Sequence, residues 1–561
     1  MTDVIGYVSG ICGAEMTVAL DRERKAAADT LNISIGVVLK ASTGAGWAVG
    51  IVSAMRSEAD GLRHIAIVDL LGEFAADGDG TPRFARGISV HPRMGTPVLT
   101  ASVQDSDLIY GKPESFHARV GTIYHDESRP AFLITDDLLA KHFAIVGSTG
   151  SGKSCSVTLL LRAILDSHPF AHILLLDPHD EYSAAFGDSA EVFNADNLQL
   201  PHWLLNFEEL IAVLVRGGSP EEQQAQASIL KDAVTQARRK FAGDGAENAW
   251  ITVDSPVPFR VSDLIQIIDE TMGKLNKADT SVPFLRLKSR LESLRADRRF
   301  AFMFAGAARD DLVSVVGDLL RIPVTGKPLS IIDMSGLPSE IVDVVVSLLF
   351  RVIFDFAVWA DRDKMPPVLL VCEEAHRYVP ADQNLGFKAS TRAIARVSKE
   401  GRKYGISLGL ITQRPSELAP TVLTQCGTLF ALRLSNELDC QFVASALPDS
   451  SHGLLAALPS LRRQEAIVVG EGVTIPIRIR FDSLPQQQQP RSGSAHFSRA
   501  WQADTADAGL IEEGIRRWRR QMRDRSTAEP DNTHNFIRKS AGRSSTDLML
   551  RGRSIVSNFK R

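Results

Sequence analysis

The chain has 561 residues, a formal net charge of −4 and five cysteines. At roughly 150 residues per domain, this length predicts about three or four structural units with large buried cores, which excludes a disulfide-stapled miniprotein. Hydrophobic residues make up 44% of the chain and charged residues 23%, which is typical of a globular protein and excludes a collagen-like or wholly disordered one.

The first part of the chain, residues 1–125, has the pattern of a small β-barrel. Its short β-rich runs are separated by turns rich in Gly, Ser and Asp, such as residues 42–46. Short strands at regular spacing with turn signals between them favour a barrel or sandwich. The predicted strands are residues 33–38, 47–52 and 64–71.

From about residue 132 the pattern changes to buried apolar strands that alternate with longer helical periods. This alternation is typical of a parallel α/β sheet, which we assign to residues 126–204 and 312–485. The interval 205–311 has a helical period and no strand core, so it predicts a helical insertion. The strands are expected at residues 143–146, 173–176, 329–332, 368–371, 407–411 and 476–480, and the insertion helices at 220–242, 261–275 and 284–296.

The last part, residues 486–561, begins with a Gln-rich break and is basic. Residues 490–561 contain 15 Lys and Arg against 8 Asp and Glu, so the remainder of the chain is acidic. A helix is predicted over residues 506–525, and its apolar stripe ends in an aromatic residue, which suits docking on protein better than binding nucleic acid. The stripe consists of Leu510, Ile511, Ile515, Trp518 and Met522. Any nucleic-acid contact by the acidic body must then be local, such as a lined channel.

Several features place the protein in the cytoplasm. The cysteines form no Cys-x-x-Cys pair, and the first ten residues carry no secretory signal. The longest apolar stretch, residues 342–360, contains Asp343, Arg351 and Asp355, and such charges are costly in a bilayer. We therefore expect a cytoplasmic protein that has no membrane partner.

The strongest chemical motif is a phosphate-binding loop of the pattern GxxxxGK[ST]. It follows the apolar strand 143–146 and opens a helical run, which is the context that this motif requires. Its backbone N–H groups cradle phosphates, its lysine reaches the β- and γ-phosphates, and its last hydroxyl ligates Mg²⁺. The residues are Gly147, Ser148, Thr149, Gly150, Ser151, Gly152, Lys153 and Ser154. ATP and Mg²⁺ are therefore the expected substrate and cofactor.

Two further strands end in carboxylates that could serve this loop. Glu373 and Glu374 follow the strand 368–371, and two adjacent acids suit a division of labour between metal support and general-base catalysis. We assign metal support to Glu373 and the base to Glu374. Asp177 and Glu181 follow the strand 173–176, and for them a structural or DNA-linked role stays open beside nucleotide contact.

Gln413 follows the strand 407–411, at the sheet edge where ligands collect in α/β folds. It is a candidate sensor of the γ-phosphate or of the attacking water. The basic run 395–405 before it could be a solvated helix face, a DNA-facing loop or an arginine finger, and spacing alone does not separate these.

Together these motifs resemble the HerA family of hexameric, RecA-like DNA translocases. The matching segments are IGYVSG, GSTGSGKS, LLLDPHDEY, LPHWLLN, IDMS, VCEEAHRYVP, the GRKYG and ITQRPS pair, and PIRIR, between residues 5 and 480. The resemblance implies an α/β fold with a RecA-like P-loop ATPase core, an N-terminal HAS β-barrel, an inserted helical bundle and a C-terminal brace on the neighbouring subunit. It also implies a companion nuclease or a sirtuin-like NADase.

By position, the resemblance assigns the nucleotide and Mg²⁺ contacts to Lys153 and Ser154, the catalytic glutamate to Glu374 and the sensor to Gln413. Arg396 or Arg402 would match the finger that acts in the neighbouring subunit's site. One departure is that many family members have Asp-Glu-Ala-His where this chain has Glu373-Glu374-Ala-His, which puts the role of Glu373 in doubt.

The resulting hypothesis is an ATP-dependent homohexamer that moves double-stranded DNA through a central channel, with an effector partner, in antiphage defence or DNA end processing. The alternative is an ATP-regulated P-loop scaffold or switch that controls a partner without processive motion along DNA.

Overall fold

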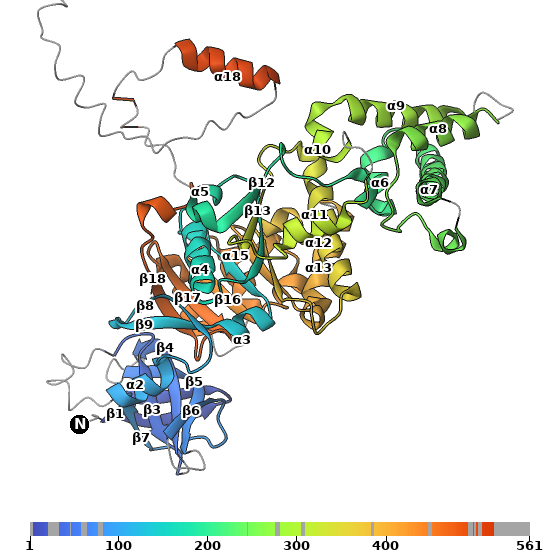
Figure 1. Cartoon of the computed structure of the whole chain (residues 1–561). Helices are drawn as coiled ribbons and strands as arrows, with labels where there is room; N and C mark the ends of the chain where they lie inside the picture. Colours follow the sequence, from blue (N-terminus) through green and yellow to red (C-terminus); the bar gives the residue numbers. More distant parts are fainter. Residues whose placement is uncertain are drawn as a thin grey trace, which may run out of the picture. The chain divides into compact units, whose positions relative to one another are not determined.

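The computed structural model describes residues 4–20, 33–44, 46–57, 64–76, 82–243, 245–274, 281–304, 309–382, 386–446, 452–491, 498, 501–502 and 508–520. The chain divides into two compact units, Met1–Ser494 and Ala495–Arg561. The first contains a β-barrel, a large mixed sheet with helices on both faces, and a helical insertion (Figure 1).

The barrel is a closed ring of six strands with a seventh strand attached. The order is β2-β1-β7-β3-β4-β5-β6, and β2 also pairs with β5, which closes the ring and removes its open edges. Alternate residues point inward to an apolar core that includes Met16, Val18 and Val68. The strands are β1 (Val4–Cys12), β2 (Glu15–Leu20), β3 (Val38–Ser42), β4 (Trp47–Ser57), β5 (His64–Ala76), β6 (Pro82–Arg86) and β7 (Pro97–Thr100). The predicted barrel is confirmed.

One barrel strand is shifted from its predicted place. The run 33–38 was expected to be a strand, but β3 begins at Val38. Gly36 has a φ of +96°, a conformation that an extended strand does not allow. The residues before Val38 therefore form a turn, although their apolar side chains match a strand pattern.

The core sheet has eleven strands in the order β12-β13-β11-β14-β15-β10-β16-β17-β18-β8-β9. The first seven are parallel and the last four antiparallel. The strands are β8 (His117–Ile123), β9 (Asp126–Ile134), β10 (Phe143–Val146), β11 (His172–Asp177), β12 (Ala190–Phe193), β13 (Leu329–Asp333), β14 (Val368–Cys372), β15 (Ile406–Thr412), β16 (Thr428–Leu432), β17 (Glu465–Gly470) and β18 (Ile477–Phe481). The predicted parallel α/β core is confirmed.

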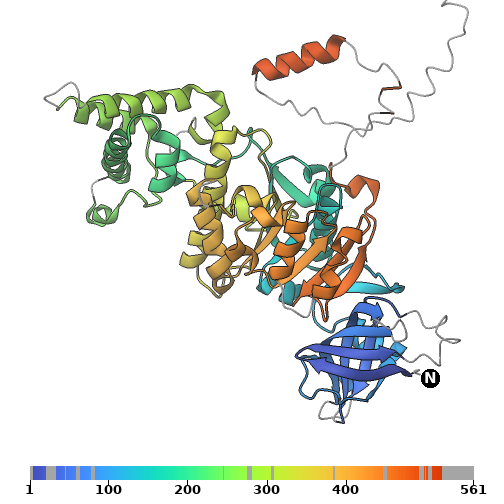
Figure 2. The ribbon, with the colours of Figure 1, turned by 180° about the vertical axis from the view of Figure 1, so that it is seen from behind.

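Helices cover both faces of this sheet, because its strands are apolar on both sides. Ala144 and Val146 of β10 join one core with α12 and α13, while Phe143 and Ile145 join the other with α4 (Figures 1 and 2). The core helices are α3 (Thr135–Ala140), α4 (Lys153–Ser167), α5 (Ser183–Phe186), α12 (Ser339–Trp359), α13 (Lys388–Glu400), α14 (Pro420–Leu423), α15 (Glu437–Ser445) and α16 (His452–Leu455). The short helix α2 (Val103–Tyr110) lies between β7 and β8.

The edge between barrel and core differs from the predicted boundary at residue 125. Residues 117–123 form β8, which pairs with β9 and with β18 of the core sheet. Ala118, Val120 and Ile123 are buried in the same core as α4. These residues alternate as a barrel strand would, so the sequence pattern alone did not separate them from the barrel.

Between β12 and β13 the described residues contain helices and no strand, as predicted. A capping box at Asn206 starts the first of them, and another at Ser219 starts the longest. The helices are α6 (Phe207–Leu214), α7 (Pro220–Ala242), α8 (Val261–Met272), α9 (Val282–Ala296), α10 (Ala301–Phe304) and α11 (Leu312–Leu320).

In the second unit the structure describes one helix, α18 (Ala508–Arg520), shorter than the predicted 506–525. Leu510, Ile511 and Trp518 of the predicted apolar stripe are more than 60% exposed; Met522 lies outside the described residues. Across the described part of the chain, none of the helices has the length and apolar character needed to cross a membrane.

Candidate active site

The phosphate-binding loop connects β10 to α4 at the carboxyl end of the parallel strands. A Cβ on Gly147 would lie 2.7 Å from the Ser151 hydroxyl oxygen, so a side chain does not fit there. Gly150 and Gly152 have φ of +74° and +109°, conformations that favour glycine. The glycines of the motif are therefore required by the shape of the loop.

Two neighbouring segments hold the loop through its backbone. The Ser148 N–H and hydroxyl both donate to the Arg433 carbonyl, each at 2.9 Å. The Gln464 N–H donates to the Ser151 carbonyl at 3.3 Å. Neither contact has a sequence signal, because each joins residues that lie far apart in the chain.

Lys153 is buried, with 6% of its surface exposed. Its Nζ donates to the Ser148 carbonyl at 3.2 Å. Burial lowers the pKa of Lys153, and the charges of Glu373, Glu374 and Glu181 oppose this shift. An anionic phosphate beside the ammonium would further favour its charged form.

Glu374 begins the turn after β14 and lies in the left-handed region, with φ of +52°. This conformation costs about 1–2 kcal/mol for a residue with a Cβ, and such strain clusters at functional sites. The Glu374 Oε1 accepts a hydrogen bond from Gln413, and Oε2 lies 3.4 Å from the His376 Nδ1. Burial lowers the pKa of His376, and the charges of Glu374 and Glu417 oppose this shift.

Gln413 joins the loop to Glu374. Its Nε2 donates to the Glu374 Oε1, and its Oε1 accepts from the Thr149 hydroxyl. This bridge is possible because β15, which carries Gln413, lies between β10 and β14 in the sheet. All three side chains line one polar cavity of about 550 Å³.

Glu373 has different surroundings from Glu374. It is 4% exposed, and its Oε2 accepts from the Tyr182 hydroxyl at 2.6 Å. Burial raises the pKa of Glu373 to about 8, and the Tyr182 hydrogen bond opposes this shift. Glu373 is not among the residues that line the polar cavity. Tyr182 was not predicted from the sequence.

Asp177 and Glu181 also lie at this edge. Asp177 is fully buried and accepts the backbone N–H groups of His179, Glu181 and Tyr182 at 3.2, 3.1 and 2.9 Å. These bonds shape the turn after β11. The charge of Glu181 acts on Lys153, which places Glu181 near the loop.

The two candidate arginines lie on α13 and just after it. Arg396 is held within its own chain: its Nη1 donates to Asp355 at 3.1 Å, and its guanidinium lies 4.2 Å from the centre of the Phe354 ring. Arg402, in the turn Gly401–Tyr404 before β15, lines an apolar cavity of about 810 Å³ at the amino ends of β14 and β15. Neither arginine lines the polar cavity of its own chain.

A glycine-rich loop between a buried strand and a helix, with a buried lysine and a carboxylate bridged to the loop by a glutamine, defines a P-loop ATPase. Residues 118–353 match the family model described as helicase HerA, central domain. The chain is 24% identical over 463 residues to the DNA double-strand break repair helicase HerA of Pyrococcus furiosus, covering 77% of this chain and 79% of that protein. It is 26% identical over 399 residues to the protein of the same name from Sulfolobus acidocaldarius, covering 70% and 74%.

Among solved structures, VirB4 of Thermoanaerobacter pseudethanolicus matches with a TM-score of 0.47 and 18% identity, covering 67% of this chain and 99% of that one. The family model and the two helicases agree with the motifs and the site described above. The central part of the chain is thus similar to the central domain of HerA helicases, and the chain is an ATPase.

Proposed function

We propose that this protein is an ATP-driven hexameric motor that moves double-stranded DNA through a central channel. The observation that carries the proposal is the Thr149–Gln413–Glu374 bridge, which links the phosphate loop directly to the carboxylate. Through this link, Gln413 can respond to the γ-phosphate and orient the Glu374 carboxylate at the same time. Its occurrence in a chain similar to HerA helicases supports coupling of hydrolysis to motion along DNA.

The residues of the loop fit a nucleotide triphosphate with Mg²⁺. Among the described residues, the buried Ser151 hydroxyl has no hydrogen-bond partner, and a backbone carbonyl is the one acceptor that Lys153 has there. Ser154 would hold Mg²⁺, with Glu373 supporting its water shell. No cluster of three His, Cys, Asp or Glu suited to a metal occurs in the described part of the chain, which agrees with an ion held by one or two side chains and by phosphate oxygens.

In this mechanism Lys153 and the loop N–H groups bind the β- and γ-phosphates, and Gln413 orients the attacking water. Glu374 accepts the proton of that water, since its carboxylate faces the polar cavity and Glu373 does not. The ion that Ser154 would hold would supply positive charge beside the phosphate oxygens. The arginine that completes the site comes from the neighbouring subunit, because both candidates lie outside the cavity of their own chain.

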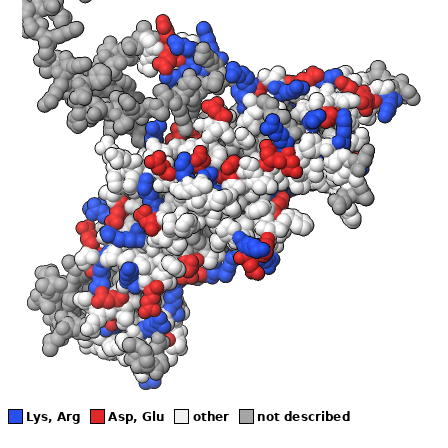
Figure 3. Space-filling view, viewed as in Figure 1, with Lys and Arg blue, Asp and Glu red and all other residues white. Residues whose placement is uncertain are grey.

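Grip on DNA would come from local basic loops in the channel. On the face shown in Figure 3, Lys and Arg alternate with Asp and Glu and no broad patch of one sign is visible. The chain as a whole carries a net charge of −4. Sequence-independent contacts to phosphates, confined to the channel, would make binding strongly sensitive to salt.

The test is ATP turnover of the purified protein with and without long duplex DNA, together with displacement of a triplex-forming oligonucleotide from that duplex. We expect duplex DNA to stimulate turnover and the wild-type protein to displace the third strand. Glu374→Gln should bind ATP and DNA but displace nothing. Turnover that DNA leaves unchanged, with no displacement, would contradict the motor and favour the ATP-regulated switch.

We further propose that the motor acts with a nuclease or a sirtuin-like NADase, in antiphage defence or DNA end processing. The support is the family resemblance of its motifs. The test is to isolate the tagged protein at its natural level and to assay the complex for DNA cleavage and NAD⁺ consumption. Neither activity in a complex that retains ATPase would contradict this part of the proposal.

A further inference from the structure

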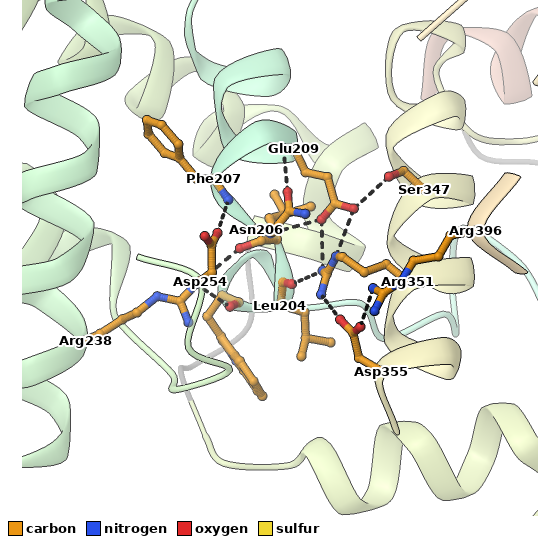
Figure 4. A network of polar contacts seen from close by, with 12 residues as sticks. Leu204, Asn206, Phe207, Glu209, Arg238, Asp254, Ser347, Arg351, Asp355 and Arg396 are labelled. Atoms are coloured by element: carbon orange, nitrogen blue, oxygen red, sulfur yellow. Dashed lines mark hydrogen bonds and ion pairs between the residues drawn. The ribbon is translucent and has the colours of Figure 1, made fainter. Parts of the chain in front are cut away.

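A chain of charged side chains joins the helical insertion to the core helices α12 and α13 (Figure 4). It starts at Glu209 of α6, which is fully buried. The Glu209 carboxylate accepts from Arg351 Nε and Nη2 at 3.2 and 2.9 Å, from the Ser347 hydroxyl at 2.8 Å and from the Asn206 N–H at 3.0 Å. A buried carboxylate with this many donors is held in one position.

The chain continues along α12 to Arg396. Arg351 Nη1 lies 3.6 Å from Asp355, one helical turn further on, and Asp355 accepts from Arg396 Nη1 at 3.1 Å. We call these four residues, Glu209, Arg351, Asp355 and Arg396, the α12 relay. It connects the base of the insertion to α13 through alternating charges.

The same turn of α12 also holds the segment that follows α13. Phe354 lies under the Arg396 guanidinium at 4.2 Å and packs edge-to-face against Tyr404 with ring centres 5.5 Å apart. Tyr404 ends the short turn that contains Arg402. Arg396 and Arg402 are therefore parts of one supported segment.

The guanidinium groups of Arg396 and Arg402 differ in their contact partners. Arg396 is engaged by a carboxylate and an aromatic ring and would have to leave both to reach a phosphate. Within the described residues, Arg402 has no such carboxylate or aromatic partner, and it lines the wall of the 810 Å³ cavity.

We propose that Arg396 is a positioning residue and that the α12 relay holds the segment 396–404 so that Arg402 enters the neighbouring subunit's ATP site. This inference rests on the proposed ring motor. Because the relay starts in the helical insertion, a shift of α6 would move Arg402 and so change hydrolysis in the next subunit.

The first test is Asp355→Asn, which removes the charge between Arg351 and Arg396. Exposed ion pairs add little to stability, so melting temperature, nucleotide affinity and ring assembly should match wild type. We expect kcat to fall about tenfold with KM for ATP unchanged, as for a small misplacement of a catalytic group. Glu127→Gln is the matched control, because Glu127 pairs with Arg480 at the same 3.1 Å and should leave kcat unchanged.

The second test exchanges the two charges. In the double variant Asp355→Arg with Arg396→Asp, the ion pair can form in reverse. Recovery of most of the kcat lost in each single variant supports a positioning role for Arg396. The reversed ion pair again joins residues 355 and 396, but it places no cation at residue 396. If Arg396→Asp abolishes turnover while Asp355→Asn keeps the wild-type kcat, Arg396 acts without the relay and the inference is overturned.

The third test places the defect in the neighbouring subunit. Asp355→Asn protein keeps an intact phosphate loop, whereas Lys153→Ala protein keeps an intact relay. Rings mixed from the two should recover turnover above the average of the separate variants; no recovery after verified subunit exchange contradicts action between subunits. Every readout in these three tests is ATP turnover without DNA. If DNA fails to stimulate the wild-type protein, the proposed motor function is contradicted, but the three tests can still be interpreted.

Discussion

At the residue scale, the two adjacent glutamates after β14 show how the backbone separates two roles. Glu373 is buried, and its carboxylate accepts a hydrogen bond from the Tyr182 hydroxyl. The left-handed conformation of Glu374 turns the next carboxylate toward Gln413 and the cavity. The two neighbouring glutamates therefore have different surroundings and are suited to different roles.

This separation predicts distinct effects of substitution in the site. Lys153→Ala removes the ammonium from the phosphate cradle and should weaken ATP affinity. Glu374→Gln leaves the cradle intact, so ATP should bind normally while kcat falls about 10²–10⁴-fold, the usual contribution of a general base. Nucleotide affinity by titration calorimetry and turnover by phosphate release measure the two effects.

Wild-type turnover in Glu374→Gln would show that this residue is not the base. The companion variant Glu373→Gln should keep turnover at saturating Mg²⁺ but need more of the ion. If it loses turnover at every Mg²⁺ concentration, as Glu374→Gln is expected to do, the two roles are misassigned.

A buried histidine behind the phosphate loop predicts a pH effect on stability. His142 precedes β10; its Nε2 donates to the Ser398 carbonyl at 3.0 Å, and its Nδ1 accepts the Leu408 N–H at 3.0 Å. Only the neutral ring makes both bonds. Burial lowers the pKa of His142 below 6.5, opposed by the Ser398 bond.

Because the unfolded chain then binds more protons than the folded one, the stability from His142 is complete above about pH 6.5 and is lost as the pH falls below it. We expect His142→Asn to show a smaller drop in melting temperature between about pH 7.5 and 5.5 than wild type, since Asn does not titrate. The exposed His91 gives the control: His91→Asn should show the wild-type drop. An unchanged drop in His142→Asn would contradict the prediction.

At the element scale, β8 is the first strand of the chain that belongs to the core sheet. Gly121 of β8 approaches β18 so closely that a Cβ would lie 2.0 Å from the Arg480 carbonyl oxygen. Gly121→Ala should therefore separate the two strands and destabilise the core sheet by about 1–3 kcal/mol, as overpacking does. Thermal unfolding with and without ATP measures this loss.

Gly10 of β1 offers the control, because a Cβ there would meet nothing closer than 3.7 Å. Gly10→Ala should change stability by about 0.5 kcal/mol or less. Equal melting temperatures for the two alanine variants would mean that the close β8–β18 approach is not a constraint on the core.

At the scale of the whole molecule, the second unit carries an exposed apolar stripe on its helix α18. The stripe exposes Leu510, Ile511 and Trp518 among arginines, a surface suited to docking on protein. The Arg491 N–H donates to the Glu181 carbonyl at 2.8 Å, so the chain belongs to the first unit at least that far. A deletion that tests the tail therefore starts at residue 495.

Removing residues 495–561 should weaken the hexamer and its cooperative ATP turnover while changing DNA affinity per assembled ring little. Mass photometry over a dilution series and DNA binding at several salt concentrations measure both. A truncated protein that stays hexameric at low concentration but binds DNA weakly, with a shallower salt slope, would show that the tail is a nucleic-acid arm.

Much of this protein was determined by local sequence pattern. The P-loop, the predicted strands of the core sheet and the longest insertion helix, α7, lie where their patterns placed them, because periodicity and glycine requirements act within a few residues. The sequence also supplied Glu374 and Gln413 as separate candidates, since each polar side chain follows a buried strand.

Only the tertiary structure decided how these parts meet. The order of the parallel strands puts β15 between β10 and β14, which brings Gln413 to both Thr149 and Glu374. Strand pairing also moved residues 117–123 into the core sheet. The α12 relay shows the same limit: its residues come from three helices far apart in the chain, and the pairing of charges depends on packing that no local pattern records.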